Sequence, residues 1–348
     1  MVFRIRLEEA DVEHDRLRIA MVSVEEFNTA QRVHVAGLSA ALARSGHAVT
    51  VYTRRENAIL PDRSRTEFGY DVVRVPAGPA LRIDEDEMIP QLGRLADRLG
   101  RAWRDAPPDV VHSHGWMSGL AGVLAERQGI PVVQTYCGLG GSSRRSQGER
   151  IVGREAARVT ALSSGELAEL VSKGVDRSRI SVVPTGVDVR MFTPWGRSAR
   201  RGTRRRVVVV RTAAPDSGLA ELVEVLSHLD DVELLITGGG SRARTVALLR
   251  SSDVVVCAPR CEPIGRVSLE AMACGVPVVA TAVGALADSV VDGVTGLHVQ
   301  PGKPRQLAKV VRGLLGDVVR RQEFGAAGRD RASERYSWER IAADTVRA

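Results

Sequence analysis

The sequence predicts an α/β protein made of two doubly wound domains in tandem. Short, continuous apolar runs rich in β-branched residues alternate with segments of helical periodicity, which is typical of parallel sheets buried on both faces. The chain has 348 residues, enough for two domains of this kind. A stretch rich in Gly, Pro and Arg, residues 187–206, lies between the two sets of runs and is expected to be the linker.

The first domain is expected to span residues 1–186, with residues 1–16 as a charged, flexible tail. Its expected strands are residues 17–23, 47–52, 72–75, 110–112, 131–135, 159–162 and 180–183. Its expected helices are residues 33–44, 88–99, 117–128 and 165–173. Gly46 follows the first of these helices, and a glycine in that position commonly ends a helix.

The second domain is expected to span residues 207–330, and residues 331–348 are expected to hold a terminal helix. Its expected strands are residues 207–210, 232–237, 254–257, 278–281 and 297–299, and its expected helices are residues 219–229, 267–273 and 304–315. Ligands of such sheets bind beyond the carboxyl ends of the strands. We therefore expect the functional site in a cleft between the two domains.

The cysteines and the N-terminal residues indicate a cytoplasmic protein. No apolar run is long enough to predict a transmembrane helix. The N-terminal residues MVFRIRLEEADVEHDR are charged and lack the apolar core of a secretory signal. The four cysteines do not have zinc-site spacing, so we expect reduced thiols.

The charge of the chain favours an anionic partner. The formal net charge is +7, from 49 Lys and Arg against 42 Asp and Glu, and only Lys173, Lys303 and Lys309 are lysines. A phosphate group or a membrane surface fits this balance. Nucleic acid is disfavoured, because the arginines are scattered and only 4% of residues are aromatic and able to stack on bases. The sequence does not indicate an oligomeric state.

The segment CEPIGRVSLEAMACGVPVVAT, residues 261–281, carries the clearest chemistry. It is expected to form a loop, a helix and a strand. The N–H groups at the start of the helix, near Gly265, can hold a phosphate. Glu262 and Glu270 can accept hydrogen bonds from hydroxyls on either side of that phosphate. Hydroxyls on both sides of a phosphate are typical of a nucleotide sugar. An ordinary turn with two solvated glutamates would have the same spacing.

The same segment resembles the retaining glycosyltransferases of family 4, whose hallmark is E-P-F-G-x-x-x-L-E-A-M-A-x-G-x-P-V-V. The likeness continues through VGALADSVVDGVTGLHVQPGKPRQLA and RASERYSWERIA, and upstream through LSSGELAELVSKGVDRSRISVVPTGVDVRMFTP. Within this family, the sequence resembles the group that includes the sucrose-phosphate synthases and the mycothiol-pathway transferases. The resemblance implies the GT-B fold, with two Rossmann-like domains facing a cleft and a terminal helix that crosses back to the first domain. It also implies a nucleotide-diphosphate-sugar donor, no metal and no separate cofactor.

The resemblance also implies roles for the residues of the donor segment. Glu262 would contact hydroxyls of the sugar, and Glu270 would contact the ribose. The amides near Ile264, Gly265 and Arg266 would hold the diphosphate.

Three further positions match the resemblance outside the donor segment. Arg211 follows the strand at 207–210 and would clamp the diphosphate as a catalytic residue, because negative charge grows there in the transition state. Gly284 would begin a loop near the donor sugar. His114, in HSHGW, lies at a strand end and could serve in catalysis. The alternative to a functional role is an ordinary surface arginine in the case of Arg211. In the case of His114 it is a histidine that serves only the core or the structure of a loop.

The sequence departs from the family in its motif residues. Ser217 stands where the family has a lysine after its arginine, and Thr29–Ala30 stands where it has Gly-Gly. Cys137, in QTYCGLGG, occupies the position of a family histidine. A cysteine cannot reproduce the hydrogen bonding of an imidazole, and side chains at Thr29–Ala30 narrow the approach to the donor.

A further departure concerns the size of the second domain. Only SRARTVALLRSS separates Gly240 from Asp253, so one βα unit of the family is expected to be missing and the base to be less enclosed.

Two functions therefore stay open. The first is an active retaining glycosyltransferase whose acceptor is a small molecule, a lipid or a glycan. The second is a catalytically weak or inactive homologue that acts as a binding or partner subunit. The two glutamates favour the first, whereas the altered lysine, Gly-Gly and histidine positions favour the second.

Overall fold

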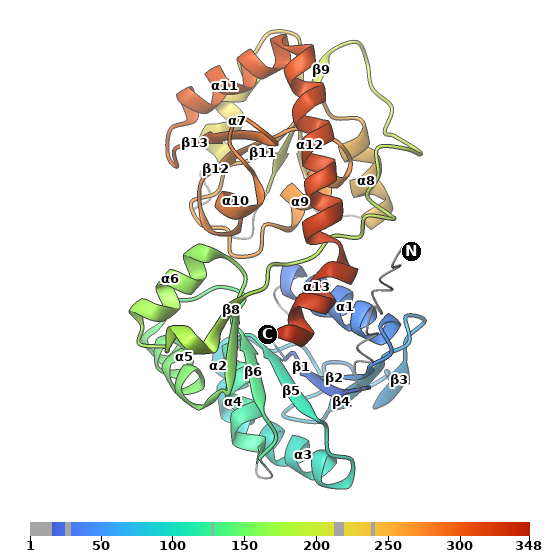
Figure 1. The fold of residues 1–348 in the computed structure, drawn as a ribbon, viewed down its shortest axis with the longest axis vertical. Coiled ribbons are helices and arrows are strands. Elements are labelled where there is room, and N and C mark those ends of the chain that lie inside the picture. Colours follow the sequence, from blue (N-terminus) through green and yellow to red (C-terminus); the bar gives the residue numbers. More distant parts are fainter. Residues whose placement is uncertain (1–15, 25–28, 127–128, 212–218, 238–240) are drawn as a thin grey trace, which may run out of the picture.

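Two β-sheets, one in each half of the chain, organise the protein (Figure 1). The computed structural model describes residues 16–24, 29–126, 129–211, 219–237 and 241–348. Each sheet has hydrophobic clusters on both of its faces, covered by helices. The predicted α/β architecture of two doubly wound domains is confirmed.

Within the described residues the first sheet has the order β3-β4-β2-β1-β5-β6-β7-β8. Its strands are β1 (Arg18–Val22), β2 (Ala48–Arg54), β3 (Arg63–Arg65), β4 (Asp71–Val75), β5 (Val110–His114), β6 (Val132–Thr135), β7 (Arg158–Ala161) and β8 (Ile180–Val182). Neighbouring strands are parallel except for β3 and β4. Sequence analysis located each of these strands except β3, whose residues Arg-Ser-Arg carry no apolar signal.

Helices on both faces bury this sheet. They are α1 (Thr29–Arg44), α2 (Glu85–Met88), α3 (Leu92–Asp105), α4 (Trp116–Ala125), α5 (Ser143–Glu155) and α6 (Ser164–Ser172), with 3₁₀ turns η1 (Ile89–Gln91) and η2 (Arg177–Arg179). Helix α5 was not predicted, because SRRSQGERIVGRE is mostly polar. Its N-terminus is fixed by Ser142, whose Oγ accepts a hydrogen bond from the amide of Arg145 at 3.2 Å.

The second sheet has the order β10-β9-β11-β12-β13 and is parallel throughout. Its strands are β9 (Arg205–Val210), β10 (Val232–Thr237), β11 (Val254–Cys257), β12 (Val278–Thr281) and β13 (Gly296–Val299). Its helices are α7 (Leu219–Ser227), α8 (Arg242–Arg250), α9 (Arg266–Ala273), α10 (Gly284–Ser289) and α11 (Pro304–Gly316).

Strand β10 forms one edge of the second sheet, as expected for a domain that lacks one βα unit. Within the described residues, helix α8 alone connects β10 to β11. The side chains of the central strands β11 and β12 are buried, whereas Ile236 on β10 is 45% exposed. The sequence predicted this short connection between Gly240 and Asp253.

The C-terminal helices join the two domains. Helix α12 (Val318–Tyr336) runs along the second domain, and α13 (Trp338–Arg347) continues from it onto α1 of the first domain (Figure 1). The boundary expected at residue 330 falls inside α12, which ends at Tyr336. No helix in the described part of the chain is long and apolar enough to cross a membrane.

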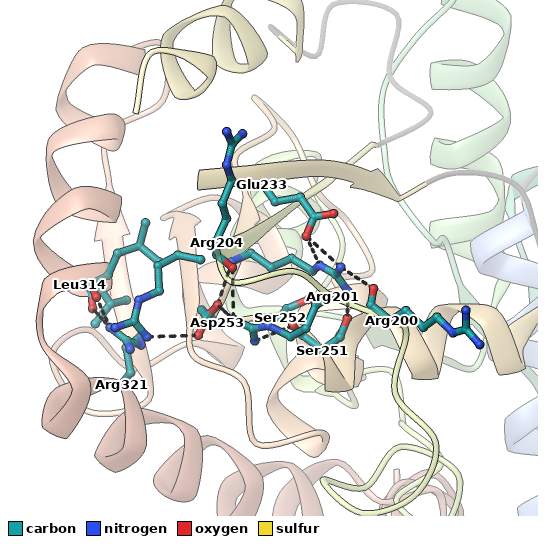
Figure 2. A network of polar contacts seen from close by, with 12 residues as sticks. Arg200, Arg201, Arg204, Glu233, Ser251, Ser252, Asp253, Leu314 and Arg321 are labelled. Atoms are coloured by element: carbon teal, nitrogen blue, oxygen red, sulfur yellow. Dashed lines mark hydrogen bonds and ion pairs between the residues drawn. The ribbon is translucent and has the colours of Figure 1, made fainter. Parts of the chain in front are cut away.

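Arginines of the linker fasten its end to the second sheet (Figure 2). Arg206 is 2% exposed and donates from Nε to Glu233 Oε2 at 2.8 Å and from Nη1 to Ser251 Oγ at 2.5 Å. Asp253 accepts from the Arg206 amide at 2.7 Å and from Arg201 Nη2 at 2.8 Å. This network lies where β9 begins, at the edge of the sheet opposite the carboxyl ends of the strands. These cations therefore have structural partners within the protein.

Candidate functional site

The loop after β11 leads into helix α9 at the carboxyl edge of the second sheet, and Glu262 shapes this loop. One oxygen of its carboxylate, Oε1, accepts hydrogen bonds from the amides of Ile264, at 3.2 Å, and Gly265, at 2.9 Å. Gly265 has φ = +70°, a left-handed conformation that favours glycine. The sequence analysis assigned these two amides to a diphosphate. The structure shows them donating to Glu262, whose carboxylate thereby closes the turn before α9; both amides precede the helix, which begins at Arg266.

Gly284, at the start of α10, lies against the backbone of the same loop. The Ala285 amide donates to the Glu262 carbonyl oxygen at 2.9 Å. A Cβ atom on Gly284 would lie 2.3 Å from that carbonyl oxygen, and the residue has φ = +48°. Only glycine fits this close approach. Gly284 begins helix α10 here, where a loop was expected, and its role near the donor sugar stays a prediction.

Glu270 lies one turn into α9 and is 1% exposed. Its Oε1 atom lies 2.5 Å from Arg266 Nη1 and 3.8 Å from Arg242 Nη1. Burial raises the pKa of Glu270, and the charges of Arg266 and Arg242 oppose that rise. The sequence analysis identified Glu270, but it assigned to Arg266 only a backbone role.

Arg211 directly follows β9 and therefore lies at the same edge of the sheet as the loop after β11. Strand β9 pairs with both β10 and β11, and the amide of Arg211 donates to Thr237 Oγ1 of β10 at 3.1 Å. The residue is exposed. Residues 212–218 lie outside the described part of the chain, so the Ser217 position is not placed.

His114 lies in the interior of the first domain. Its ring is 0% exposed and packs 4.3 Å from the His112 ring and 5.3 Å from the His34 ring. Neither ring nitrogen has a hydrogen-bond partner among the described residues. Burial lowers the pKa of His114 well below its usual range. The structure thus places His114 in the core, which is the alternative that the sequence left open, and its catalytic role stays a prediction.

The loop between β6 and α5 of the first domain faces the loop after β11 of the second domain. Cys137 has φ = +59° and is buried with Leu162 and with Ile264 of the second domain. A Cβ atom on Gly138 would lie 3.2 Å from Pro263. The position of the family histidine is therefore used here for contact between the two domains. Ala30 packs at the rim of the same cluster, whereas the side chain of Thr29 lies outside the description.

Two buried carboxylates, which the sequence analysis did not identify, hold this loop. Glu166 accepts from the amides of Gly138, at 3.1 Å, and Leu162, at 2.6 Å, and Glu149 accepts from the amide of Gly140 at 3.0 Å. Burial raises the pKa of Glu166 to about 7. The sequence SSGE ahead of an apolar run is a helix-capping signal that could have indicated Glu166.

Helices α6 and α10 meet across the two domains (Figure 1). Asp288 of α10 accepts a hydrogen bond from the Ser164 amide at 2.6 Å and a second one from Ser164 Oγ. Arg331 and Tyr336 of α12 donate to the carbonyl oxygen of Asp288. The Asp288 carboxylate of the second domain thus caps helix α6 of the first domain.

The four cysteines are thiols. Among the described residues, no three His, Cys, Asp or Glu side chains are gathered in a way that could hold a metal ion.

Comparisons with known proteins agree with this arrangement. Residues 29–186 match the family model described as glycosyl transferase 4-like domain, and residues 232–331 match that of the glycosyl transferases group 1. The D-inositol 3-phosphate glycosyltransferase of Paenarthrobacter aurescens is 32% identical and covers 90% of this chain and 91% of its own. The enzyme of that name from Xylanimonas cellulosilytica is 33% identical, with 94% of each chain covered.

Solved structures show the same fold. Sucrose-phosphate synthase from Thermosynechococcus elongatus aligns with a TM-score of 0.85 at 24% identity, over 95% of this chain and 98% of its own. Trehalose-6-phosphate synthase OtsA aligns with a TM-score of 0.75 at 11% identity, over 95% and 98%.

Proposed function

The chain belongs to the family 4 glycosyltransferases of the GT-B fold, and from this premise we propose that it transfers a sugar, with retention of configuration, from a nucleoside diphosphate sugar to a small phosphorylated polyol. The observation that carries the proposal is the cluster of Glu262, Gly265, Glu270 and Gly284 around the start of α9. This cluster lies opposite the loop of the first domain that contains Gly138.

Each residue of the donor site has a role in this proposal. Glu270 accepts hydroxyls of the ribose, and Glu262 accepts hydroxyls of the sugar through the carboxylate that also shapes the loop. Arg211 and the first-turn amides of α9 beyond Gly265 stabilise the diphosphate, since such amides have no partner within the helix. No metal ion is assigned to the reaction.

The reaction proceeds by attack on the face of the sugar from which the diphosphate departs. The bond between the anomeric carbon and the diphosphate oxygen breaks, and a bond to the acceptor oxygen forms. The proton of the acceptor hydroxyl leaves with the diphosphate. Arg211 acts on the rate because the negative charge on the leaving group grows in the transition state.

The names of the relatives support a phosphorylated acceptor. D-inositol 3-phosphate, sucrose-phosphate and trehalose-6-phosphate appear in the names of three of them. In this chain the N-terminus of α5 follows the loop that faces Pro263, and its Arg144 side chain is 71% exposed. A helix N-terminus with an arginine suits the phosphate of such an acceptor.

A transfer assay tests the proposal. UDP-, GDP- and ADP-glucose are each incubated with D-inositol 3-phosphate, fructose 6-phosphate and glucose 6-phosphate. We expect acceptor-dependent release of one nucleoside diphosphate and a product whose anomeric NMR signal has the configuration of the donor. Formation of a product with retained anomeric configuration, lost in Glu262→Ala, would exclude an inactive homologue. Nucleotide binding without any product would favour the inactive partner subunit instead.

A further inference from the structure

The ion pair between Arg266 and Glu270 has one hydrogen bond, although an arginine and a carboxylate can form two. One nitrogen of Arg266, Nη1, contacts one oxygen of Glu270, Oε1, at 2.5 Å. Arg266 Nε and Glu270 Oε2 are both buried, and neither has a hydrogen-bond partner among the described residues. Arginine and carboxylate can form two parallel hydrogen bonds, and buried polar atoms without partners are costly. The observed pair therefore leaves one donor and one acceptor available for other partners.

A second arginine neutralises the same carboxylate. Arg242 Nη1 lies 3.8 Å from Glu270 Oε1, and its guanidinium lies 5.2 Å from the centre of the buried Phe192 ring. Two positive charges therefore face one negative charge. Glu270 keeps a cationic neighbour even when Arg266 points elsewhere, which a buried carboxylate requires.

Arg266 is placed to reach another anion. It is the first residue of α9, and its side chain reaches one turn into the helix to contact Glu270. Rotation about its side-chain bonds moves the guanidinium back toward the N-terminus of the helix, where N–H groups favour negative charge. Its side chain is 24% exposed, so this movement does not require the core to open.

We propose that Arg266 exchanges partners when a nucleoside diphosphate binds. Its guanidinium leaves Glu270 and contacts the diphosphate, and the released carboxylate of Glu270, still beside Arg242, accepts hydroxyls of the nucleoside. Arg266 is then a catalytic residue that shares the leaving group with Arg211. This inference rests on the donor class given in the proposed function, but not on the acceptor.

The exchange predicts that two substitutions weaken nucleotide binding in different ways: Arg266→Met lowers mainly the affinity for the diphosphate, whereas Glu270→Gln lowers the affinity for diphosphate and monophosphate alike. Calorimetry compares UDP, GDP and ADP with UMP, GMP and AMP. Arg266→Met should weaken the diphosphate by about tenfold, as expected for one charge-assisted hydrogen bond, and the monophosphate by less than about twofold. Glu270→Gln should weaken both ligands by a similar factor, because both carry the ribose. Arg266→Lys should keep most of the wild-type preference for the diphosphate over the monophosphate.

A control removes a comparable pair elsewhere. Arg340 and Asp344 form an exposed i,i+4 pair on α13 at 3.0 Å, and Arg340→Met should leave both affinities unchanged. Thermal unfolding of each variant reports whether α9 remains intact, and Arg266→Lys keeps the test available if Arg266→Met unfolds.

Three outcomes overturn the inference. Wild-type affinity of Arg266→Met for both ligands would refute the exchange while the proposed function stands. Equal loss of affinity for both ligands would show that Arg266 acts only through Glu270. A wild-type protein that binds none of the diphosphates would refute the proposed function and the exchange together.

Discussion

Glu262 combines a structural and a chemical role in one side chain. Its Oε1 atom closes the turn before α9 through the amides of Ile264 and Gly265, and in our proposal its carboxylate also contacts the donor sugar. These two hydrogen bonds hold the turn even before a ligand binds. The motif in the sequence identified the residue, but the pattern alone did not indicate that its own loop supplies its hydrogen-bond partners.

Two substitutions of Glu262 separate these roles. Glu262→Ala should lower the free energy of unfolding by about 1 kcal/mol, through loss of the hydrogen bonds that close the turn, and abolish transfer. Glu262→Gln keeps an acceptor oxygen for the turn, so it should cost less stability but still reduce transfer strongly. Urea unfolding and the transfer assay measure the two effects. A fully active Glu262→Gln would mean that the residue only holds the turn before α9.

The buried histidines make stability depend on pH. Burial lowers the pKa of His34 to about 4 and that of His112 to about 3. The unfolded chain binds these protons at its ordinary pKa near 6.5, so below that pH the unfolded state gains protons that the folded state does not. The contribution is complete above about pH 6.5 and is lost as the pH falls toward 4 and 3.

Urea unfolding between pH 7 and pH 4 tests this dependence. His34→Gln should make stability fall less steeply with decreasing pH, whereas His228→Gln, at an exposed position, should leave the slope unchanged. An identical slope in wild type and His34→Gln would show that the histidine cluster is not the cause.

The residue scale also shows the limit of sequence reasoning. Glu270 and Gly284 were identified because their types and spacing match a family motif. His114 packs against His34 of α1, and His34 packs in turn against Trp338 of α13, so this cluster joins segments from opposite ends of the chain. Likewise, the contact between Arg242 and Glu270 joins two helices whose packing no local pattern specifies.

At the scale of elements, α13 docks on the first domain through one aromatic side chain. Trp338 packs between Gly37 of α1 and Gly186. A Cβ atom on Gly37 would lie 2.2 Å from the Trp338 ring, and one on Gly186 would lie 2.4 Å from it. The absence of side chains at these two glycines allows the helix to reach α1.

Gly37→Ala should therefore destabilise the protein by about 1–3 kcal/mol, because the added methyl group overpacks this contact. Gly93→Ala is the matched control on α3, where no atom lies within 4 Å of the added Cβ, and it should be neutral or slightly stabilising. Thermal unfolding compares the two variants. Equal stability of both would mean that Trp338 shifts without cost.

The elements that were predicted best have a continuous apolar signal. Strands β9, β11 and β12 are buried valine-rich runs, and their existence follows from the sequence. Helices α5 and α12 were missed because their sequences are largely polar and their apolar contacts are few. They are stabilised by packing against elements distant in the sequence, which local periodicity does not report.

At the scale of the whole molecule, two kinds of contact hold the domains together. Asp288 caps α6 through Ser164, and Ile264 packs against Leu162 and Cys137. Both lie between the two domains, whereas the linker and α12 to α13 form the covalent connections. Since residues around both contacts belong to the proposed site, we expect the relative position of the domains to respond to the donor.

Asp288→Ala should therefore increase the radius of gyration of the ligand-free protein in small-angle X-ray scattering. Asp317→Ala is a suitable control, because Asp317 caps α12 within one domain. Asp317→Ala should lower the free energy of unfolding by about 1 kcal/mol and leave the radius of gyration unchanged. No difference between the two scattering profiles would show that the cap at α6 does not hold the domains together.

The positive charge of the molecule has a partly structural explanation. Arg201 and Arg206 are bound to carboxylates of the second domain, and Arg54 and Arg321 are buried against carbonyl oxygens. The net charge of +7 suggested an anionic partner, but composition could not separate these cations from those at the cleft.

The most direct test of the account locates the donor on the chain. Hydrogen–deuterium exchange is measured with and without UDP, GDP and ADP, each in a separate experiment. The account predicts that one diphosphate slows exchange of the amides in residues 262–273, around the start of α9, and that Glu270→Gln weakens this protection. Protection confined to other segments, or none with any of the three nucleotides, would contradict it.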